Sequence, residues 1–209
     1  MLIPFKGGRH KTRLSTVLDR ALREEFSLLM LGEVLDAVVG AGLGKSCYVV
    51  SSHQRALGLA RSRRMTTLQE AANGGVNAAV LRGMSKAVES EFLVIPADLP
   101  LLSSSDLDRV IALKSEAADI VISPSRAFDG TNLLFFSREK RVRLSYDRNS
   151  FWNHVEDVAK EGYSLAVYAG WDVLFDVDTA QDMRELAKAR TDSRSVVFAK
   201  EALMRWDSS

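Results

Sequence analysis

The sequence has little cysteine and no excess of either charge, and each shortage excludes a class of protein. Cys47 is the only cysteine in 209 residues. An intrachain disulfide and a cysteine-based metal cluster are therefore excluded, and a reducing compartment is expected. The 28 basic and 27 acidic residues leave a net charge of +1, whereas proteins that bind duplex nucleic acid carry a strongly basic surface. We expect a cytoplasmic protein with no nucleic-acid partner.

Long apolar runs are also missing. No stretch of about 18 uninterrupted apolar residues occurs, so no membrane span is expected. The apolar opening Met1–Phe5 is too short for a signal-peptide core and has no basic region before it, which argues against secretory export. An apolar content of 46% is enough for one full hydrophobic core, and two independent domains are not expected.

Strand-like apolar runs alternate with helix-like periodicity along most of the chain. Strands are expected at residues 2–5, 47–50, 65–68, 92–97, 120–122, 133–136, 164–168 and 173–175, and helices at 15–39, 76–88, 103–114, 150–160 and 181–189. This order predicts a single-domain α/β, Rossmann-like fold whose mostly parallel sheet has helices on both faces. The domain is expected to cover residues 1–190. Residues 191–209 are expected to form a C-terminal tail, either docked on the domain or facing a partner.

A basic, glycine-containing loop follows the first predicted strand. It holds Lys6, Gly7, Gly8, Lys11 and Arg13 ahead of a helix. Glycines let backbone N–H groups approach phosphate oxygens, while lysine and arginine neutralise their charge. A solvated basic turn is the alternative, but ligands of such sheets bind beyond the carboxyl ends of the strands, which favours a polyphosphate site. The loop is not a Walker loop, because no glycine directly precedes Lys11.

Three carboxylates follow two later strands. Asp98 comes directly after an apolar run, where desolvation would be costly without a cation, and Asp176 and Asp178 alternate along an extended segment, so that they point the same way. Magnesium prefers one or two protein carboxylates together with substrate phosphates. The alternative is that Asp176 and Asp178 only cap the following helix. Their position opposite the phosphate loop favours the metal.

Small polar residues occur at two further places. After the third strand, Asn73, Gly74 and Asn77 could let a purine nucleotide lie close to the backbone, and Gln69 or Glu70 could contact the base, a role left open. Further along the chain, a turn and a helix start offer hydroxyl and amide groups for a second anion site, at Thr131, Asn132 and Ser150. His154, one helical turn later, is interpreted as an ordinary histidine.

Taken together, these residues resemble the 2-phospho-L-lactate guanylyltransferase family, which belongs to the nucleotide-diphospho-sugar transferase superfamily. The resemblance extends to about Leu186 and rests on six stretches in the same order, namely residues 4–6 with 11–14, 77–79, 97–102, 129–132, 149–151 with His154, and 176–179. It implies the nucleotide-diphospho-sugar transferase fold, GTP as donor, magnesium as cofactor and a small phosphorylated carboxylic acid as acceptor. In this family the acceptor is 2-phospholactate, phosphoenolpyruvate or 3-phosphoglycerate, and the reaction belongs to coenzyme F-420 biosynthesis.

The resemblance also implies residue roles. Lys11 and Arg13 are expected on the triphosphate, where they are catalytic together with Asp98. A metal is expected on Asp98, Asp176 and Asp178, and the acceptor on Thr131 and Ser150. One departure is Asp147, which stands where family members usually have glycine.

Alternatives to this interpretation remain open at this stage. The same scaffold could serve a sugar phosphate or a molybdopterin-type acceptor, because the fold determines the donor half better than the acceptor half. The chain could also be a nucleotide-binding module without catalytic activity. The three carboxylates argue against this, because a protein that only binds a nucleotide does not need a metal site. A homodimer is left open.

Overall fold

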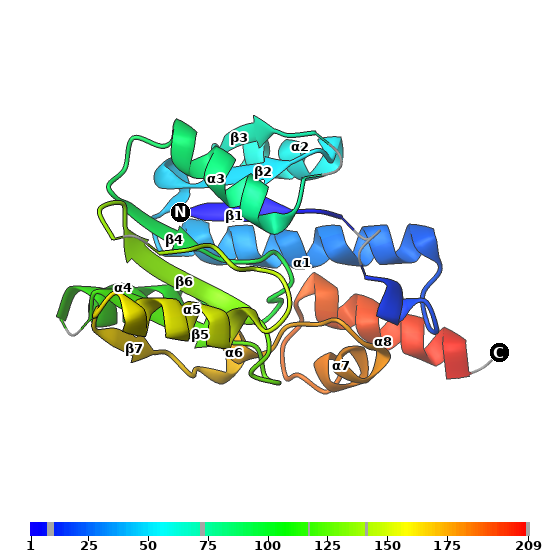
Figure 1. The fold of residues 1–209 in the computed structure, drawn as a ribbon. Coiled ribbons are helices and arrows are strands. Elements are labelled where there is room, and N and C mark those ends of the chain that lie inside the picture. Colours follow the sequence, from blue (N-terminus) through cyan, green and yellow to red (C-terminus); the bar gives the residue numbers. More distant parts are fainter. Residues whose placement is uncertain (8–10, 72–73, 117, 141, 208–209) are drawn as a thin grey trace.

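The computed structural model describes residues 1–7, 11–71, 74–116, 118–140 and 142–207, and it is built around a seven-stranded sheet (Figure 1). The strand order is β3-β2-β1-β4-β6-β5-β7. The strands are β1 (Leu2–Phe5), β2 (Tyr48–Ser51), β3 (Thr66–Gln69), β4 (Glu91–Val94), β5 (Ile120–Pro124), β6 (Thr131–Ser137) and β7 (Leu165–Val167).

The sheet is parallel except at β6. Strands β3, β2, β1 and β4 pair in parallel, as do β5 and β7, whereas β6 is antiparallel to both β4 and β5. The prediction of a mostly parallel α/β sheet is therefore confirmed. Because β6 is reversed, its first residues, Thr131 and Asn132, lie at the same edge as the carboxyl ends of the other strands. That edge is where ligands of α/β sheets bind.

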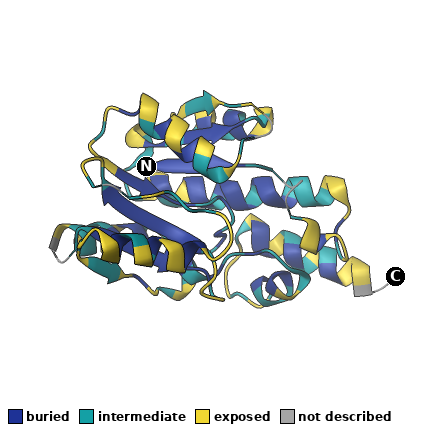
Figure 2. Ribbon diagram, in the orientation of Figure 1, coloured by how far each residue is buried: buried dark blue, intermediate teal, exposed yellow. Residues whose placement is uncertain are grey.

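Helices cover both faces of the sheet (Figure 1). Alternate residues of a strand point to opposite faces, so Ile3 packs on the side of α1 (Arg20–Gly40), α2 (Gln54–Ser62) and α4 (Ser104–Glu116). Leu2 packs on the side of α3 (Val76–Lys86) and α5 (Ser150–Lys160). A Cβ atom at Gly83 of α3 would lie 2.6 Å from Leu2, so a glycine is needed for this close packing. Figure 2 shows the buried faces of the helices turned toward the strands.

A third hydrophobic cluster lies beyond the sheet and contains the end of the chain. Helix α8 (Arg194–Asp207) packs against α1 and α7 (Ala180–Leu186). The buried members of this cluster are Leu14, Leu18, Phe26, Met30, Phe175, Val177, Met183, Leu186, Val196, Ala199 and Leu203. Residues 194–207 are therefore docked on the domain, one of the two alternatives for the predicted tail.

Three elements differ from the predicted ones. Residues 173–175 were predicted as a strand, but Trp171–Leu174 form the short helix α6. Short apolar runs have no periodicity that separates a strand from a buried helix, and this one is apolar because α6 packs on β5 and β6. Helix α1 begins only at Arg20, where Asp19 accepts a hydrogen bond from the N–H of Leu22. Helix α2 was not predicted from the sequence.

None of the helices within the described residues has both the length and the apolar character that crossing a membrane requires.

Candidate active site at the carboxyl ends of the strands

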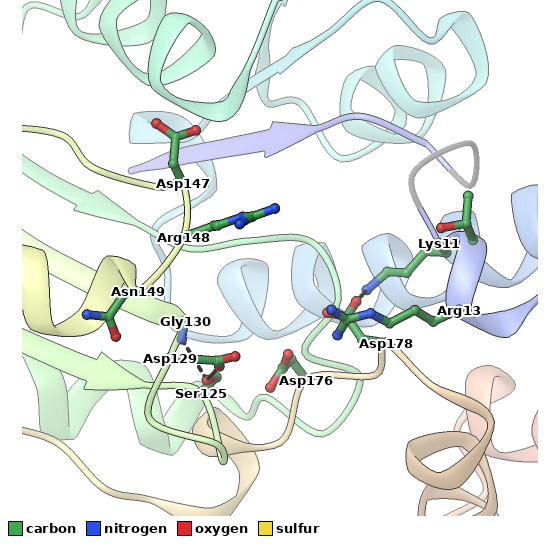
Figure 3. Close-up of a pocket in the computed structure, with 11 residues that line it drawn as sticks. Lys11, Arg13, Ser125, Asp129, Gly130, Asp147, Arg148, Asn149, Asp176 and Asp178 are labelled. Atoms are coloured by element: carbon green, nitrogen blue, oxygen red, sulfur yellow. Dashed lines mark hydrogen bonds and ion pairs between the residues drawn. The ribbon is translucent and has the colours of Figure 1, made fainter.

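Two adjoining cavities open at the edge where the parallel strands end. Their volumes are about 910 Å³ and about 460 Å³. Both are lined by Lys11, Gly130, Asp147, Asp176 and Asp178, so they form one continuous cleft. The larger cavity also has Arg13 and Arg148 on its walls, and Figure 3 shows Lys11 and Arg13 on the opposite side from the Asp147–Asn149 loop.

Lys11 lies between two of the predicted carboxylates. Its Nζ atom is 2.5 Å from Asp98 Oδ2 and 2.5 Å from Asp178 Oδ1, and it donates to the carbonyl oxygen of Val177 at 2.7 Å. Burial alone would lower the pKa of Lys11, but the two carboxylates outweigh burial and raise it. Lys11 is therefore a permanent cation that joins the β4 side of the site to the segment before α7.

Asp98 and Asp178 each form an ion pair with Lys11, whereas Asp176 forms none with the described residues. Burial raises its pKa to about 6, and the neighbouring Asp98 and Asp178 add to the shift. Asn132 Nδ2 holds it in place, donating to Asp176 Oδ1 at 3.3 Å and to the carbonyl oxygens of Val173 and Leu174 at 2.9 and 3.2 Å. Asn132, predicted to contact the acceptor, thus has its amide N–H groups directed at residues 173–176, although it also lines the smaller cavity.

The predicted metal site can be tested for fit on these atoms. Within the described residues, no three histidine, cysteine, aspartate or glutamate side chains are grouped closely enough to hold a metal ion by themselves. However, Asp98 Oδ1 is buried without a hydrogen-bond partner, and the raised pKa of Asp176 marks a site short of positive charge. These oxygens fit magnesium that is shared with substrate phosphates. Magnesium binding by Asp98, Asp176 and Asp178 stays a prediction.

The alternative role for Asp176 and Asp178, capping the following helix, is wrong. Thr179 caps α7 and forms a capping box with Asp182. Asp182 also accepts hydrogen bonds from the backbone N–H groups of Asp178 and Thr179, at 3.1 and 2.8 Å. Arg126 pairs with Asp182 and Glu185 and stacks on a neighbouring aromatic ring, which ties the β5–β6 turn to α7. The carboxylate of Asp178 is thus left free to face Lys11.

The basic loop after β1 is only partly described. Gly7 has a φ of +74°, a left-handed backbone conformation that glycine adopts more easily than other residues. It lines the smaller cavity. Lys6 lines the same cavity, and its Nζ is 2.5 Å from Glu70 Oε1, beyond the end of β3. Arg13 is exposed on the wall of the larger cavity. Gly8 lies outside the described residues.

The segment before α3 contributes glycines to the cleft, whereas its asparagine contacts another loop. Gly74 lines the smaller cavity, and Asn73 lies outside the described residues. Asn77 Oδ1 accepts from the N–H of Tyr146 at 2.9 Å, and its Nδ2 donates to Asp147 Oδ2 at 3.3 Å. Asn77 does not itself line either cavity. It holds the loop before α5 against α3, and a nucleotide contact of Asn77 stays a prediction.

Asp147, the departure from the family pattern, is exposed and lines both cavities. Its side chain faces solvent and accepts a hydrogen bond from Asn77, and within the described residues it forms no ion pair with Arg148 or Arg143. The Arg148 side chain extends into the larger cavity (Figure 3), and within the described residues its guanidinium forms no ion pair. Arg148 was not identified as a site residue from the sequence. Its position directly before the αL residue Asn149 and the start of α5 could have indicated it.

The predicted acceptor residues Thr131 and Ser150 lie side by side at the floor of the smaller cavity. Both are buried, and Ser150 Oγ donates to Thr131 Oγ1 at 3.1 Å. Thr131 Oγ1 is also 3.0 Å from Nδ1 of His154, whose side chain is completely buried. Ser150 is the first residue of α5, so the unpaired N–H groups of the helix start are available as further donors. The structure thus brings these side chains together, and their contact with an acceptor stays a prediction.

Known proteins resemble this chain in sequence, and solved structures resemble it in fold. A family model described as guanylyl transferase CofC like matches residues 1–205. The 2-phospho-L-lactate guanylyltransferase of Methanosarcina barkeri is 35% identical over 88% of this chain and 84% of its own. The phosphoenolpyruvate guanylyltransferase of Rubrobacter xylanophilus is 34% identical over 88% of this chain and 91% of its own.

Solved structures agree on the fold. A protein of Desulfovibrio desulfuricans G20 assigned to the nucleotide-diphospho-sugar transferases superposes with a TM-score of 0.77 at 15% identity, covering 99% of this chain and 96% of its own. CMP:2-keto-3-deoxy-manno-octonic acid synthetase superposes with a TM-score of 0.59 at 11% identity, covering 96% and 98%. The match over nearly the whole sequence, on a fold shared with nucleotidyltransferases, places this chain in the CofC-like guanylyl transferase family.

Proposed function

We propose that the chain transfers GMP from GTP to the phosphate of a small phosphorylated carboxylic acid and releases pyrophosphate. The observation that carries this proposal is the position of Lys11 between Asp98 and Asp178, in a cleft whose larger cavity also presents Arg13 and Arg148. The three cations of this cleft suit two anionic substrates, and its carboxylates suit a magnesium ion shared with substrate phosphates. Membership of the CofC-like family supports guanylyl as the group transferred.

The reaction needs little proton chemistry. The second pKa of a phosphate monoester is about 6, so the acceptor is already an anionic nucleophile at neutral pH. One of its oxygens forms a bond to the α-phosphorus of GTP, and the bond from that phosphorus to the oxygen bridging to the β-phosphate breaks. The electron pair leaves with pyrophosphate. A side-chain general base is not required, and His154 is buried away from the larger cavity.

The main barrier is the approach of two anions, and the basic residues of the cleft lower it. Lys11 and Arg13 would neutralise the triphosphate and the leaving pyrophosphate, which would stabilise charge that develops in the transition state. Magnesium held by Asp98, Asp176 and Asp178 would supply further positive charge to the phosphates. Arg148, on the opposite wall, can bind a planar carboxylate through two parallel hydrogen bonds.

The phosphate of the acceptor is assigned to the Thr131 side of the smaller cavity, and its carboxylate to Arg148 in the adjoining larger cavity. Thr131 and the start of α5 offer hydroxyl and backbone donors for an oxyanion. The relatives named above act, by their names, on 2-phospho-L-lactate and on phosphoenolpyruvate, and both compounds carry one phosphate and one carboxylate. We propose the same class of acceptor here, and with it a role in coenzyme F-420 biosynthesis. Asp147 lines both cavities, so its charge faces this acceptor.

Pyrophosphate release tests the proposal directly. Each of the four nucleoside triphosphates would be combined with 2-phospho-L-lactate, phosphoenolpyruvate, 3-phosphoglycerate or a sugar phosphate over a magnesium titration, and products would be identified by mass. We expect release with GTP and an acid phosphate, a product carrying added GMP, and no release after magnesium is chelated. Release only with a sugar phosphate would favour the sugar-nucleotide alternative. Binding of GTP without turnover on any acceptor would indicate a binding module.

A further inference from the structure

Thr131 and His154 belong to a chain of hydrogen bonds whose proton positions can be deduced. The backbone N–H of Ser145 donates to His154 Nε2 at 3.0 Å. On the other side of the ring, His154 Nδ1 is 3.0 Å from Thr131 Oγ1, which also accepts from Ser150 Oγ at 3.1 Å. Thr131, Ser150 and His154 are all buried, with His154 at 0% exposure.

The histidine tautomer follows from the backbone. A peptide N–H can only donate, so His154 Nε2 must be an unprotonated acceptor. The neutral imidazole then carries its proton on Nδ1, which donates to Thr131 Oγ1. A hydroxyl oxygen has two acceptor lone pairs, and the protons of His154 and Ser150 fill both on Thr131. The hydroxyl proton of Thr131 must therefore point elsewhere.

Burial keeps this arrangement neutral. Desolvation lowers the pKa of His154 to about 4, and the nearby Asp157 and the backbone of Ser150 offset only part of the shift. At neutral pH the imidazole is therefore uncharged, which agrees with its contacts to one donor and one acceptor. The role of His154 as an ordinary histidine, expected from the sequence, does not account for this arrangement.

We propose that His154 is a positioning residue that turns the hydroxyl proton of Thr131 into the smaller cavity, toward an oxygen of the acceptor's phosphate. The inference rests on the proposed function for the identity of the ligand. It also changes the predicted role of Ser150. The proton of Ser150 Oγ is directed at Thr131, so Ser150 acts through Thr131 and through its backbone N–H at the start of α5.

The proton positions can be measured without substrate. Protein labelled with ¹⁵N-histidine would be studied by long-range ¹H–¹⁵N NMR, which distinguishes the two tautomers of each of the three histidines. His154→Gln identifies the signal of His154. We expect the Nδ1–H tautomer, unchanged from about pH 8 down to about pH 5.5. An Nε2–H tautomer, or an imidazolium in this range, would overturn the inference whatever the enzyme's activity.

Kinetics then test whether His154 acts through Thr131. In His154→Gln the amide oxygen can still accept from Ser145 at the place of Nε2, while the N–H donor at the place of Nδ1, which faces Thr131, is lost. We expect the KM for the acceptor to rise about three- to tenfold, with the KM for GTP changed by less than about twofold. Thr131→Val should raise the acceptor KM by about ten- to a hundredfold, because a donor to an anion is removed.

The double variant provides the control. Once Thr131 is valine, His154→Gln should raise the acceptor KM by less than about twofold more, because the group that it positions is absent. Independent, multiplying effects would contradict the inference, as would a fall in kcat with no change in the acceptor KM. A wild-type chain that forms no guanylylated product from any acid phosphate contradicts the proposed function instead, and the NMR result still decides the tautomer.

Discussion

Lys11 and Asp178 are 167 positions apart in the sequence, yet Nζ of one lies 2.5 Å from Oδ1 of the other. The same Nζ reaches Asp98, so one lysine joins the loop after β1, the loop after β4 and the segment before α7. This contact fixes the distance between the expected triphosphate side and the expected metal side of the cleft.

Lys11→Met should separate phosphate binding from base binding. Methionine keeps most of the side-chain volume but removes the charge, so we expect GTP to bind at least about tenfold more weakly, and guanosine to bind nearly as before. Isothermal titration calorimetry with both ligands measures the difference. Lys11→Arg, which keeps the charge, is the matched control. Equal losses for GTP and guanosine would show that Lys11 does not face the phosphates.

Asp98→Asn should abolish turnover and leave the fold intact. The amide keeps the shape of the side chain but removes a charge, and it eases the repulsion that contributes to the raised pKa of Asp176. We expect at least about a hundredfold loss of kcat, with an unchanged or higher Tm. Asp119→Asn, whose carboxylate pairs with Lys140 outside both cavities, is the control and should keep full activity. Near-normal turnover of Asp98→Asn in saturating magnesium would exclude Asp98 from the metal site.

Asp147→Asn tests the charge at the mouth of the smaller cavity. Asparagine keeps an oxygen that can accept from Asn77, so the loop should stay in place while the repulsion of an anionic acceptor is removed. We expect the acceptor KM to fall about three- to tenfold at low salt and less at high salt. An unchanged KM would mean that Asp147 does not face the acceptor. A change in preference among the three acid phosphates would identify it as a specificity residue.

Arg148→Ala should weaken acceptor binding more than GTP binding. Its guanidinium extends into the larger cavity, and loss of a charge-assisted contact to a carboxylate should raise the acceptor KM by about tenfold or more. Arg143→Ala is the matched control on the same loop, because Arg143 is exposed and lines neither cavity. If the KM for GTP rises more than that for the acceptor, Arg148 belongs to the triphosphate side.

His154 should make the fold less stable in mild acid. Burial lowers its pKa from about 6.5 to about 4, so the unfolded chain binds a proton there that the folded chain does not. The free energy of unfolding should therefore decrease as the pH falls through this window, by up to about 3 kcal/mol at its lower end. Urea unfolding at several pH values measures the trend. The difference between the wild type and His154→Gln isolates this residue from Asp176, whose raised pKa acts in the opposite direction.

Much of this architecture could be predicted from the sequence, because the strands and most helices can be recognised from the spacing of their apolar residues. The residues of the site could be predicted because parallel strands end at one edge, so Lys11 and Asp98 had to lie near one another. Their ion pair could not be predicted, because it depends on side-chain directions in loops. The reversal of β6 was not predicted, although only residues 125–130 separate it from β5. A parallel connection needs about a dozen residues or more, so this spacing together with Asp129-Gly130 indicates a hairpin.

Contacts between buried polar side chains could not be predicted from sequence patterns. His154 and Thr131 are 23 positions apart, and neither position has a periodicity that indicates their contact. Asn132 and Asn77 were assigned to ligands because amides follow strands in this region. In the structure their side chains hold protein loops, Asn132 at residues 173–176 and Asn77 at the loop before α5. Sequence patterns identified where polar groups gather, but not which protein groups each of them contacts.

The third hydrophobic cluster has a consequence for the order of events during synthesis. Leu14 and Val177 flank Lys11 and Asp178 in the sequence, and both are buried together with Val196, Ala199 and Leu203 of α8. A nascent chain can pair β1, β2, β3 and β4 as soon as they leave the ribosome. The catalytic edge cannot be completed then, because Asp176, Asp178 and the apolar residues of α8 that support both of its halves come later in the chain. The newly made protein can therefore form the β1–β4 part of its sheet before it can form its active site.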